Sequence, residues 1–469
     1  MIIKTIFVTI FQGVEFRNLV RSDVCKRLAA SPNIRLIFFT NSEVKKKYYA
    51  SEFNGPNIVY EVIENYRPTS PLNGIFWFLK FNLIKTKTID IKREQQLRRE
   101  KKYFKHFLKL VFNRLFARKF FRRIARFADW RLVRDDFFAP YFEKYRPRLV
   151  LAAHLFSDIE GALVRQAKKM GVPTVGVINS WDKLTARCMI RILPDKLMVH
   201  NRLVKEDAAK YADMASADIL VTGLPHFDFY INEGRTPKED FFGKNGLKPE
   251  DKIILFCPAG TVKDLEAHAK SEKFYSQYSD PDTETIALLD DLIASGELGD
   301  NLRLVVRFPP NDNVNISGGY KTKVVFQTPG RRFTLDRGQD WDMNREDFRE
   351  LADTLYYSSV VLTYPSTMVI DAAAFKKPVI NLDIDFPNTP RNFLTWFYEV
   401  DHYQPVLKTK AAPVVKTKAE MVEWIKKFLK DPEINKKERE ELVKLECEPF
   451  DGRAGQRVAD FVLAQINHV

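Results

Sequence analysis

Short apolar runs alternate with helix-length segments over most of the chain. The runs Thr5–Ile10 and Ile34–Thr40 are typical of buried strands, and the segment Phe16–Ala30 between them has the length of a helix. The same alternation returns at 147–228 and again from Lys252 onwards. A strand, a helix and a second strand in this order form the repeating unit of a parallel sheet. The pattern therefore predicts an α/β protein with two domains.

The clearest of these units lies at 355–383. A β-rich run at 360–363 is followed by a loop and then by a helix-length apolar segment at 368–375. Ser366 and Thr367 stand where a helix N-cap belongs, so their hydroxyls would lie beside unpaired backbone N–H groups. Such a helix end favours an anion such as a phosphate, although an ordinary N-cap gives the same pattern.

Composition narrows the class of protein. The chain has 469 residues, of which 45% are apolar and 13% aromatic, which excludes disorder on a large scale. The four cysteines have no CxxC spacing and no cluster of metal ligands is apparent, so we expect no disulfide framework, metal or cofactor. The first apolar run reads as a strand rather than a signal peptide, and no window is apolar enough to span a membrane. We therefore expect a cytoplasmic protein.

The net charge of +14 is confined to one segment. Between Lys85 and Arg134 there are 18 Lys and Arg residues against four acidic ones, while the remaining 57 basic and 57 acidic residues cancel. Aromatic and aliphatic residues recur every three or four positions from Phe104 to Phe127, with arginines between them. A core helix with a solvated basic face, a nucleic-acid site and an interfacial helix on anionic lipid all fit this pattern.

The aromatic content of this segment and the lack of a nucleic-acid motif favour lipid over nucleic acid. We therefore predict peripheral association with the inner face of the plasma membrane, and no nucleic-acid partner. The predicted membrane contacts are Arg114, Arg118, Phe120, Arg122 and Arg123.

Three motifs, in order along the chain, resemble those of a known family. Leu304-Val-Val-Arg-Phe-Pro-Pro310 resembles an Arg-x-His-Pro strand end, and Ser359-Val-Val-Leu-Thr-Tyr-Pro-Ser-Thr-Met-Val-Ile-Asp371 is similar to an Asp-Tyr-Ser-Ser loop with a following acidic residue. Asp451-Gly-Arg-Ala454, the third motif, looks like an Asp-Gly-Lys-Ala helix start. In addition, the loop Ser180-Trp-Asp-Lys-Leu-Thr185 stands in the place of a Trp-His-Gly motif. With the two α/β halves, this set resembles GT-B glycosyltransferases, and more narrowly the bacterial surface-polysaccharide and CDP-glycerol glycerophosphotransferase family.

The resemblance covers nearly the whole chain except about 70–145, and it implies two Rossmann-like domains facing across a cleft. The N-terminal acceptor domain would occupy 1–235, with 70–145 as a basic amphipathic helical insertion. The donor domain would occupy 250–445, and a C-terminal helix at 446–469 would cross back to the N-terminal domain.

The resemblance also implies roles for the loops that follow strands. Asp182 is the first candidate for the base that deprotonates the acceptor hydroxyl, because the apolar surface of Trp181 and Leu184 can raise a carboxylate pKa. Glu15 and Asp158 are further candidates for this base, and Gly13, His154, Trp181, Lys183 and Arg187 are acceptor-side candidates. For each, a solvated loop residue is the alternative. The donor-binding candidates are Gly260, Thr261, Arg307, Pro309, Tyr364, Ser366, Thr367 and Asp371.

Two departures from the family pattern affect the predicted reaction. Phe308 stands where the strand-end motif has His, and Asp182 replaces the His of the acceptor-side motif. We therefore expect a glycosyltransferase that moves a sugar from a nucleotide-sugar donor to a lipid-linked glycan acceptor. The alternatives are a CDP-glycerol-type glycerophosphotransferase, a nucleotide-sugar 2-epimerase, and a non-catalytic membrane- or RNA-binding protein.

Overall fold

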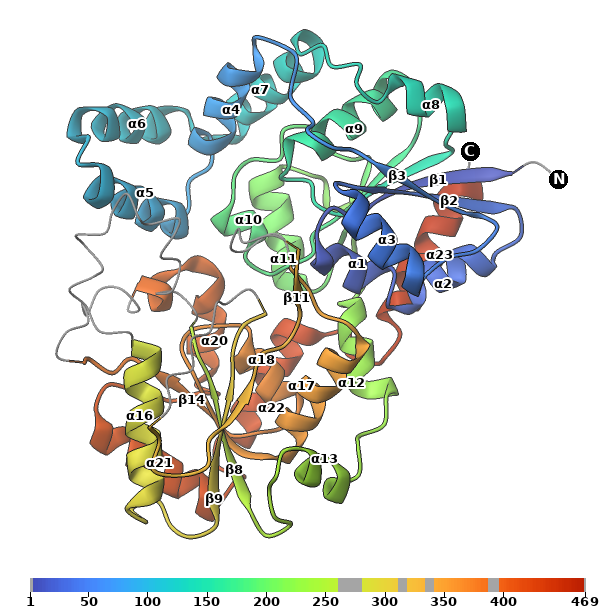
Figure 1. The fold of residues 1–469 in the computed structure, drawn as a ribbon. Coiled ribbons are helices and arrows are strands. Elements are labelled where there is room, and N and C mark those ends of the chain that lie inside the picture. Colours follow the sequence, from blue (N-terminus) through green and yellow to red (C-terminus); the bar gives the residue numbers. More distant parts are fainter. Residues whose placement is uncertain (1–2, 260–280, 311–318, 334–340, 387–395, 468–469) are drawn as a thin grey trace. The chain divides into compact units, whose positions relative to one another are not determined.

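The computed structural model describes residues 3–259, 281–310, 319–333, 341–386 and 396–467. The chain forms two compact units (Figure 1). Unit 1 contains Met1–Asn232 together with Glu448–Val469, and unit 2 contains Glu233–Cys447. Each unit is described by itself.

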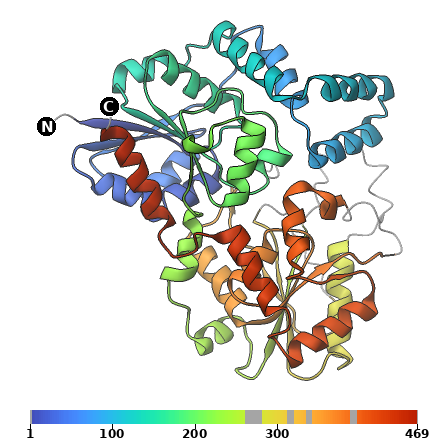
Figure 2. The ribbon, with the colours of Figure 1, turned by 180° about the vertical axis from the view of Figure 1, so that it is seen from behind.

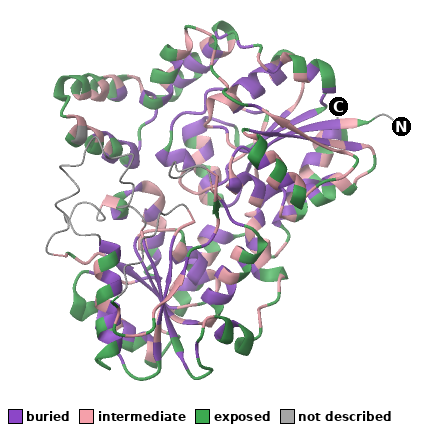
Figure 3. Ribbon diagram, viewed as in Figure 1, coloured by how far each residue is buried: buried purple, intermediate pink, exposed green. Residues whose placement is uncertain are grey.

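Unit 1 is built on a parallel sheet with the strand order β3-β2-β1-β4-β5-β6-β7. The strands are β1 (Lys4–Thr9), β2 (Ile34–Thr40), β3 (Ile58–Val62), β4 (Leu149–Ala152), β5 (Thr174–Val177), β6 (Lys196–Val199) and β7 (Ile219–Val221). The side chains of the central strands are buried on both faces of the sheet, as expected for strands covered by helices on each side, whereas those of the edge strand β3 are half-buried. Figure 3 shows this buried centre. The predicted α/β class is confirmed.

The helices of unit 1 follow the strands. They are α1 (Gly13–Leu19), α2 (Asp23–Ala30), α3 (Glu43–Glu52), α8 (Ala139–Tyr145), α9 (Asp158–Lys169), α10 (Lys183–Ala186), α11 (Arg202–Asp207), α12 (Asp228–Asn232) and α23 (Ala454–Asn467). The single helix predicted at Phe16–Ala30 is two helices, because the Ser22 hydroxyl accepts a hydrogen bond from Val24 N (3.3 Å) and starts α2 anew. Helix α23 packs against α2 (Figure 2).

The basic segment forms the helices α5 (Lys87–Glu100), α6 (Tyr103–Phe116) and α7 (Lys119–Leu132), and α4 (Asn73–Asn82) precedes it. The periodic stretch from Phe104 to Phe127 is broken between α6 and α7, where Ala117 ends α6. Helix α4 contacts both α6 and α7, and α5 lies beside α6 (Figure 1).

One predicted membrane contact is wrong. Arg122 is buried, and its Nε and Nη2 donate hydrogen bonds to Asp213 at 2.8 and 2.6 Å. Arg126 donates to the same carboxylate at 2.6 Å. Burial opposes ionisation of Asp213, but the hydrogen bonds from both arginines outweigh it and lower its pKa. The inner side of α7 is therefore held to the α/β core by an ion cluster that periodicity could not reveal.

Unit 2 holds a second parallel sheet with the order β10-β9-β8-β13-β14-β15. Its strands are β8 (Lys252–Cys257), β9 (Leu302–Arg307), β10 (Val325–Gln327), β13 (Ser358–Thr363), β14 (Val379–Leu382) and β15 (Val414–Val415), with a small antiparallel pair, β11 (Arg331–Arg332) and β12 (Trp341–Asp342). Its helices are α13 (Lys238–Lys244), α16 (Pro281–Ala294), α17 (Arg345–Tyr357), α18 (Met368–Ala374), α20 (Gln404–Thr409), α21 (Lys418–Lys430) and α22 (Lys436–Cys447).

Candidate active site

The sheet order of unit 1 brings three predicted loops together. Strand β1 pairs with β4, and β4 pairs with β5, all in parallel. The loops that leave these strands at their carboxyl ends therefore emerge side by side. They carry Glu15, His154 and Asp182, which lie far apart in the sequence.

Asp182 follows β5 and is half-buried. Its Oδ1 accepts a hydrogen bond from the Ser180 hydroxyl at 2.5 Å. Its charge also acts on neighbouring groups, which are Lys92, Lys183, His154 and His200. Burial lowers the pKa of the Lys183 amine, so this side chain keeps its positive charge less readily than a surface lysine. Asp182 is thus an acid group with access to solvent at the end of a buried strand.

Glu15 and Glu160 are more deeply buried than Asp182. Glu15 is 1% exposed and Glu160 is 0% exposed. Burial raises the pKa of Glu15 to about 7. Burial, and after it the neighbouring charge of Glu15, raise the pKa of Glu160 well above its usual value. A carboxyl closed off from solvent cannot touch an acceptor in this arrangement, so Glu15 supports the site from beneath.

Sequence reasoning missed Glu160. It is the third residue of α9, after the N-cap Ser157, whose hydroxyl accepts a hydrogen bond from Glu160 N at 3.3 Å. Ser157-Asp-Ile-Glu160 has the Ser-x-x-Glu spacing of a capping box, and this signal was available in the sequence. That Glu160 lies beside Glu15 depends on the pairing of β1 with β4, which the sequence does not show.

Two histidines at the strand ends are neutral. Burial lowers the pKa of His154 to about 3 and that of His200 to about 4. Within the described residues, Nδ1 of each ring is buried without a hydrogen-bond partner. The imidazole of His154 therefore offers this site a neutral polar group rather than a charge.

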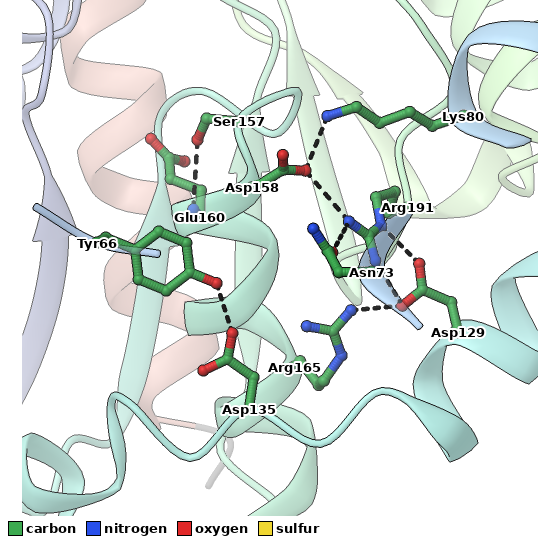
Figure 4. Close-up of polar contacts among 10 residues, drawn as sticks. All are labelled: Tyr66, Asn73, Lys80, Asp129, Asp135, Ser157, Asp158, Glu160, Arg165 and Arg191. Atoms are coloured by element: carbon green, nitrogen blue, oxygen red, sulfur yellow. Dashed lines mark hydrogen bonds and ion pairs between the residues drawn. The ribbon is translucent and has the colours of Figure 1, made fainter. Parts of the chain in front are cut away.

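Asp158, a further candidate base, is held in ion pairs (Figure 4). Lys80 of α4 lies 2.8 Å from its Oδ1, and Arg191 lies 3.3 Å from the same oxygen. Arg191 also contacts Asp129 of α7 at 2.6 Å, and Arg165 contacts Asp129 at 2.6 Å. These contacts give Asp158 a structural role, because they join α4 and α7 to the start of α9.

The remaining acceptor-side candidates surround this region. Gly13 is the buried first residue of α1, and Trp181 packs against the apolar cluster under β5 and β6. Lys183 is buried at the start of α10, and Arg187 is exposed just after it. Glu15, His154, Trp181, Asp182 and Lys183 thus come from adjacent strand ends, while Arg187 lies at their edge.

The donor-side candidates lie in unit 2, and the structure describes part of them. Gly260 and Thr261 lie outside the described residues. Ser366 is half-buried in the loop between β13 and α18; its Oγ lies 2.9 Å from the Thr363 hydroxyl and accepts from Met368 N at 3.2 Å. Thr367 is the exposed N-cap residue, and its side chain makes no cap hydrogen bond. The two hydroxyls therefore stand at the start of α18, as the loop pattern predicts.

Other donor-side candidates are engaged inside unit 2. Arg307 is buried and donates to Gln327 Oε1 at 2.9 Å, to Glu350 Oε2 at 2.7 Å and to Asp347 O at 2.9 Å. Tyr364 is also buried, and its hydroxyl lies 2.8 Å from the Thr285 hydroxyl. Pro309 is half-buried after β9, and Asp371 is buried in α18. Arg307 and Tyr364 thus stabilise the strand ends.

Exposed apolar side chains gather on the helices α4, α6 and α7. The inner sides of these helices pack on Leu83 and Met189. On their outer sides, Arg114, Arg118 and Arg123 are exposed beside apolar groups. The exposed apolar residues are Ile75, Trp77, Phe78 and Phe81 on α4, Tyr103, Phe104, Phe107, Leu108, Val111 and Leu115 on α6, and Phe120, Ile124, Phe127 and Leu132 on α7.

The described residues contain neither a metal-binding cluster nor a membrane-spanning helix. They contain no group of three or more His, Cys, Asp or Glu side chains placed to hold a metal ion. Among the same residues, no helix combines the length and the apolar character needed to cross a bilayer.

Comparison with known proteins places this geometry in context. A family model described as CDP-glycerol:poly(glycerophosphate) glycerophosphotransferase matches residues 164–464, which is more than half of the chain. The teichoic acid poly(ribitol-phosphate) polymerase of Bacillus spizizenii is 21% identical over 274 residues, covering 57% of this chain and 37% of that protein. The chain therefore aligns with less than half of this curated relative.

Solved structures support the fold. A variant of the wall teichoic acid polymerase TagF superposes with a TM-score of 0.54 at 14% identity, covering 99% of this chain and 89% of that one. The UDP complex of S. aureus MnaA gives a TM-score of 0.52 at 14% identity, covering 100% and 98% of the two chains. At this identity the likeness concerns the fold, and it agrees with the predicted GT-B-like architecture. On the strength of the family match, the chain belongs to the CDP-glycerol:poly(glycerophosphate) glycerophosphotransferase family, whose members are transferases of cell-surface polymer synthesis.

Proposed function

We propose that this protein transfers a sugar from a nucleotide-sugar donor to a hydroxyl of a cell-surface glycan acceptor. The observation that carries the proposal is Asp182, a half-buried carboxylate at the carboxyl end of β5, among the strand-end loops of unit 1. Carboxyl ends of parallel strands are the usual place for ligands in α/β folds, and a carboxylate there can accept a hydroxyl proton.

In the proposed reaction, Asp182 takes the proton of the acceptor hydroxyl. The acceptor oxygen then forms a bond to the anomeric carbon of the donor sugar, and the bond from that carbon to the nucleoside diphosphate breaks. Charge develops on the leaving diphosphate. Within unit 2, the hydroxyls of Ser366 and Thr367 stand at the start of α18, and hydroxyls at a helix start are suited to donate hydrogen bonds to an anionic group such as a nucleotide diphosphate.

A second candidate is supported by family membership. In a CDP-glycerol-type transfer, the acceptor oxygen would attack the phosphorus next to glycerol, and CMP would leave. The same base would serve both reactions, since both begin with loss of a hydroxyl proton. Asp182 and Phe308 stand where the family motifs have His, which favours sugar transfer.

A panel of UDP-, CDP-, GDP- and TDP-linked sugars together with CDP-glycerol tests these alternatives. A donor that binds the native protein raises its melting temperature, by an amount that corresponds to about 2.7 kcal/mol at a hundred times Kd. Incubation of the stabilising donor with an acceptor should then release a nucleoside diphosphate for sugar transfer, or CMP for glycerophosphate transfer. A product formed without acceptor would indicate a 2-epimerase.

The matched variants are Asp182→Asn and Asp218→Asn. Asp218 lies in the same unit, is half-buried like Asp182 and pairs with Lys196 at 2.7 Å. We expect Asp182→Asn to keep donor-induced stabilisation and to lose at least a hundredfold in turnover, because general-base catalysis contributes about that much or more. Asp218→Asn should behave as wild type. Full turnover by Asp182→Asn would remove this residue from the mechanism.

The reaction would take place at a membrane surface, where a lipid-linked acceptor resides. The exposed apolar residues of α4, α6 and α7 would enter the interface, and Arg114, Arg118 and Arg123 would contact anionic headgroups. Each arginine near such a surface contributes about 1 kcal/mol. The triple variant Arg114→Gln/Arg118→Gln/Arg123→Gln should therefore bind anionic liposomes roughly a hundredfold more weakly in flotation experiments.

A matched control removes the same charge elsewhere. Lys418, Lys426 and Lys430 are exposed on α21 of unit 2. The triple variant Lys418→Gln/Lys426→Gln/Lys430→Gln should float with anionic liposomes as wild type does. Failure of the wild-type protein to float, or equal loss in both triple variants, would contradict a membrane-facing role for α6 and α7.

A further inference from the structure

Two buried carboxyl groups occupy equivalent places in neighbouring strand–helix pairs of unit 1. Glu15 is the third residue of α1, which follows β1, and Glu160 is the third residue of α9, which follows β4. Strands β1 and β4 are neighbours in parallel register, with Phe7 opposite Val150. The sheet order therefore brings the starts of the two helices together.

Each carboxyl uses one oxygen to hold its own loop. Oε2 of Glu15 accepts a hydrogen bond from Gln12 N at 2.9 Å, in the loop after β1. Oε2 of Glu160 accepts one from His154 N at 2.7 Å, in the loop after β4. Among the described residues, Oε1 of Glu15 and Oε1 of Glu160 are both buried without a hydrogen-bond partner.

Unpartnered buried oxygens on neighbouring carboxyls have a simple chemical resolution. Two carboxylates repel each other. In addition, a buried carboxylate oxygen that has no donor lacks the hydrogen bonds that water would supply. A single proton on either group turns this repulsion into a short, charge-assisted hydrogen bond. The pairing of β1 with β4 makes the two glutamates neighbours, and after burial the charge of Glu15 is the next cause of the raised pKa of Glu160.

We propose that Glu15 and Glu160 share one proton, and that the resulting hydrogen bond between their Oε1 atoms joins the β1–α1 loop to the β4–α9 loop beneath the acceptor site. Both glutamates act as positioning residues, since neither is open to solvent. The pair carries one negative charge, placed at the starts of two helices, where the helix dipoles favour it.

The other charged groups around the pair fit this assignment. Lys45, whose Nζ donates to Phe11 O at 2.9 Å, and Lys183 both act on Glu15 and favour one negative charge. His154 faces Glu160 through its backbone N–H and is neutral, so it does not supply a second positive charge. The structure thus provides positively charged neighbours for Glu15, whereas the contacts that favour an ionised Glu160 are uncharged, the His154 backbone N–H and the Thr9 hydroxyl.

The stability of the free protein tests the shared proton without any substrate. Burial raises the pKa of Glu15 from 4.5 to about 7, so its contribution to stability is complete below pH 4.5 and is lost as the pH rises through 7. In Glu160→Gln, the amide donates to Glu15 without needing a proton. We therefore expect the melting temperature of Glu160→Gln, relative to wild type, to rise steadily from pH 5 to pH 8.5.

Glu43→Gln is the matched control, because Glu43 lies in the first turn of α3 but is exposed. Its melting temperature should differ from wild type by the same amount at every pH. A pH-independent difference for Glu160→Gln would overturn the proposal. If this variant does not fold, infrared spectra of the wild type decide the question: a protonated carboxyl band that persists at pH 7 supports the shared proton, and its absence refutes it.

The consequence for catalysis rests on the proposed function. Loss of the shared proton should loosen both loops, so the KM for the acceptor should rise by up to tenfold per pH unit above the pH at which the pair ionises. Glu160→Gln should remove this rise while keeping kcat. If no donor is turned over, the proposed function fails, whereas the melting and infrared results still decide the proton assignment.

Discussion

Arg122 and Arg123 are neighbours in α7 that face opposite environments, and their substitution separates stability from membrane binding. Arg122 donates two hydrogen bonds to Asp213 and a third to Lys210 O at 3.1 Å. The side chains of Arg122 and Asp213 are 8% and 1% exposed. Arg123 is exposed on the same helical turn.

The expected decrease in the free energy of unfolding caused by Arg122→Gln follows from this burial. Breaking a buried ion pair by removing one partner typically costs about 3–5 kcal/mol, because the other charge is left uncompensated. Arg126 still holds Asp213 at 2.6 Å, so we expect the lower end, about 3 kcal/mol. Arg123→Gln should change the free energy of unfolding by less than about 0.5 kcal/mol, as exposed substitutions usually do.

Urea unfolding followed by circular dichroism measures the first effect, and liposome flotation measures the second. Arg123→Gln should weaken binding to anionic liposomes about fivefold, which corresponds to about 1 kcal/mol. Arg122→Gln, assayed below its unfolding midpoint, should bind as wild type. The reasoning is refuted if Arg122→Gln unfolds with the wild-type midpoint, or if it weakens flotation as much as Arg123→Gln does.

Three further predictions concern unit 1. Asp129→Asn leaves the buried Arg165 without its carboxylate and Arg191 with Asp158 alone, and should lower the free energy of unfolding by about 3–5 kcal/mol, with faster amide exchange in α4 and α7. Asp136→Asn, at an exposed partner of Lys169, should lower it by less than about 1 kcal/mol. Gly176→Ala places a Cβ 2.5 Å from Leu155 Cδ1 and 2.8 Å from Pro194 Cγ, so the free energy of unfolding measured in urea should fall by about 1–3 kcal/mol. Gly161→Ala in α9 is the control, because its Cβ meets no atom within 4 Å and should not destabilise the protein. Asp213 has a lowered pKa, so its contribution to stability is present above pH 3.8 and is lost as the pH falls; the difference between wild type and Asp213→Asn in denaturant midpoint should therefore be large at pH 7 and shrink at pH 3.

The α/β class and several strands followed directly from the sequence. Apolar runs such as 5–10 and 34–40 become β1 and β2 because continuous burial requires continuous apolar sequence. The loop residues Asp182 and Ser366 could also be found, since each lies just after such a run. Local pattern is sufficient where the structure depends on neighbours in the chain.

The rest depends on contacts between distant residues. Arg122 and Arg123 look alike in a periodic basic segment, and what separates them is Asp213, which lies 91 residues from Arg122. Glu160 gains its meaning from Glu15 on the adjacent strand unit, and the adjacency of β1 and β4 is a property of the sheet order. The ion pairs of Arg307 likewise need Glu350, which comes from a helix 43 residues away.

The path of the chain through unit 1 sets the order in which the two units can be completed during synthesis. Val458, Val462 and Ile466 of α23 belong to the same core as Ile6 and Leu36. A ribosome makes α23 only after the whole of unit 2, which is one continuous stretch, Glu233–Cys447. The second unit can therefore fold first, while the nascent first unit keeps an uncovered apolar face that a chaperone would have to shield until α23 emerges.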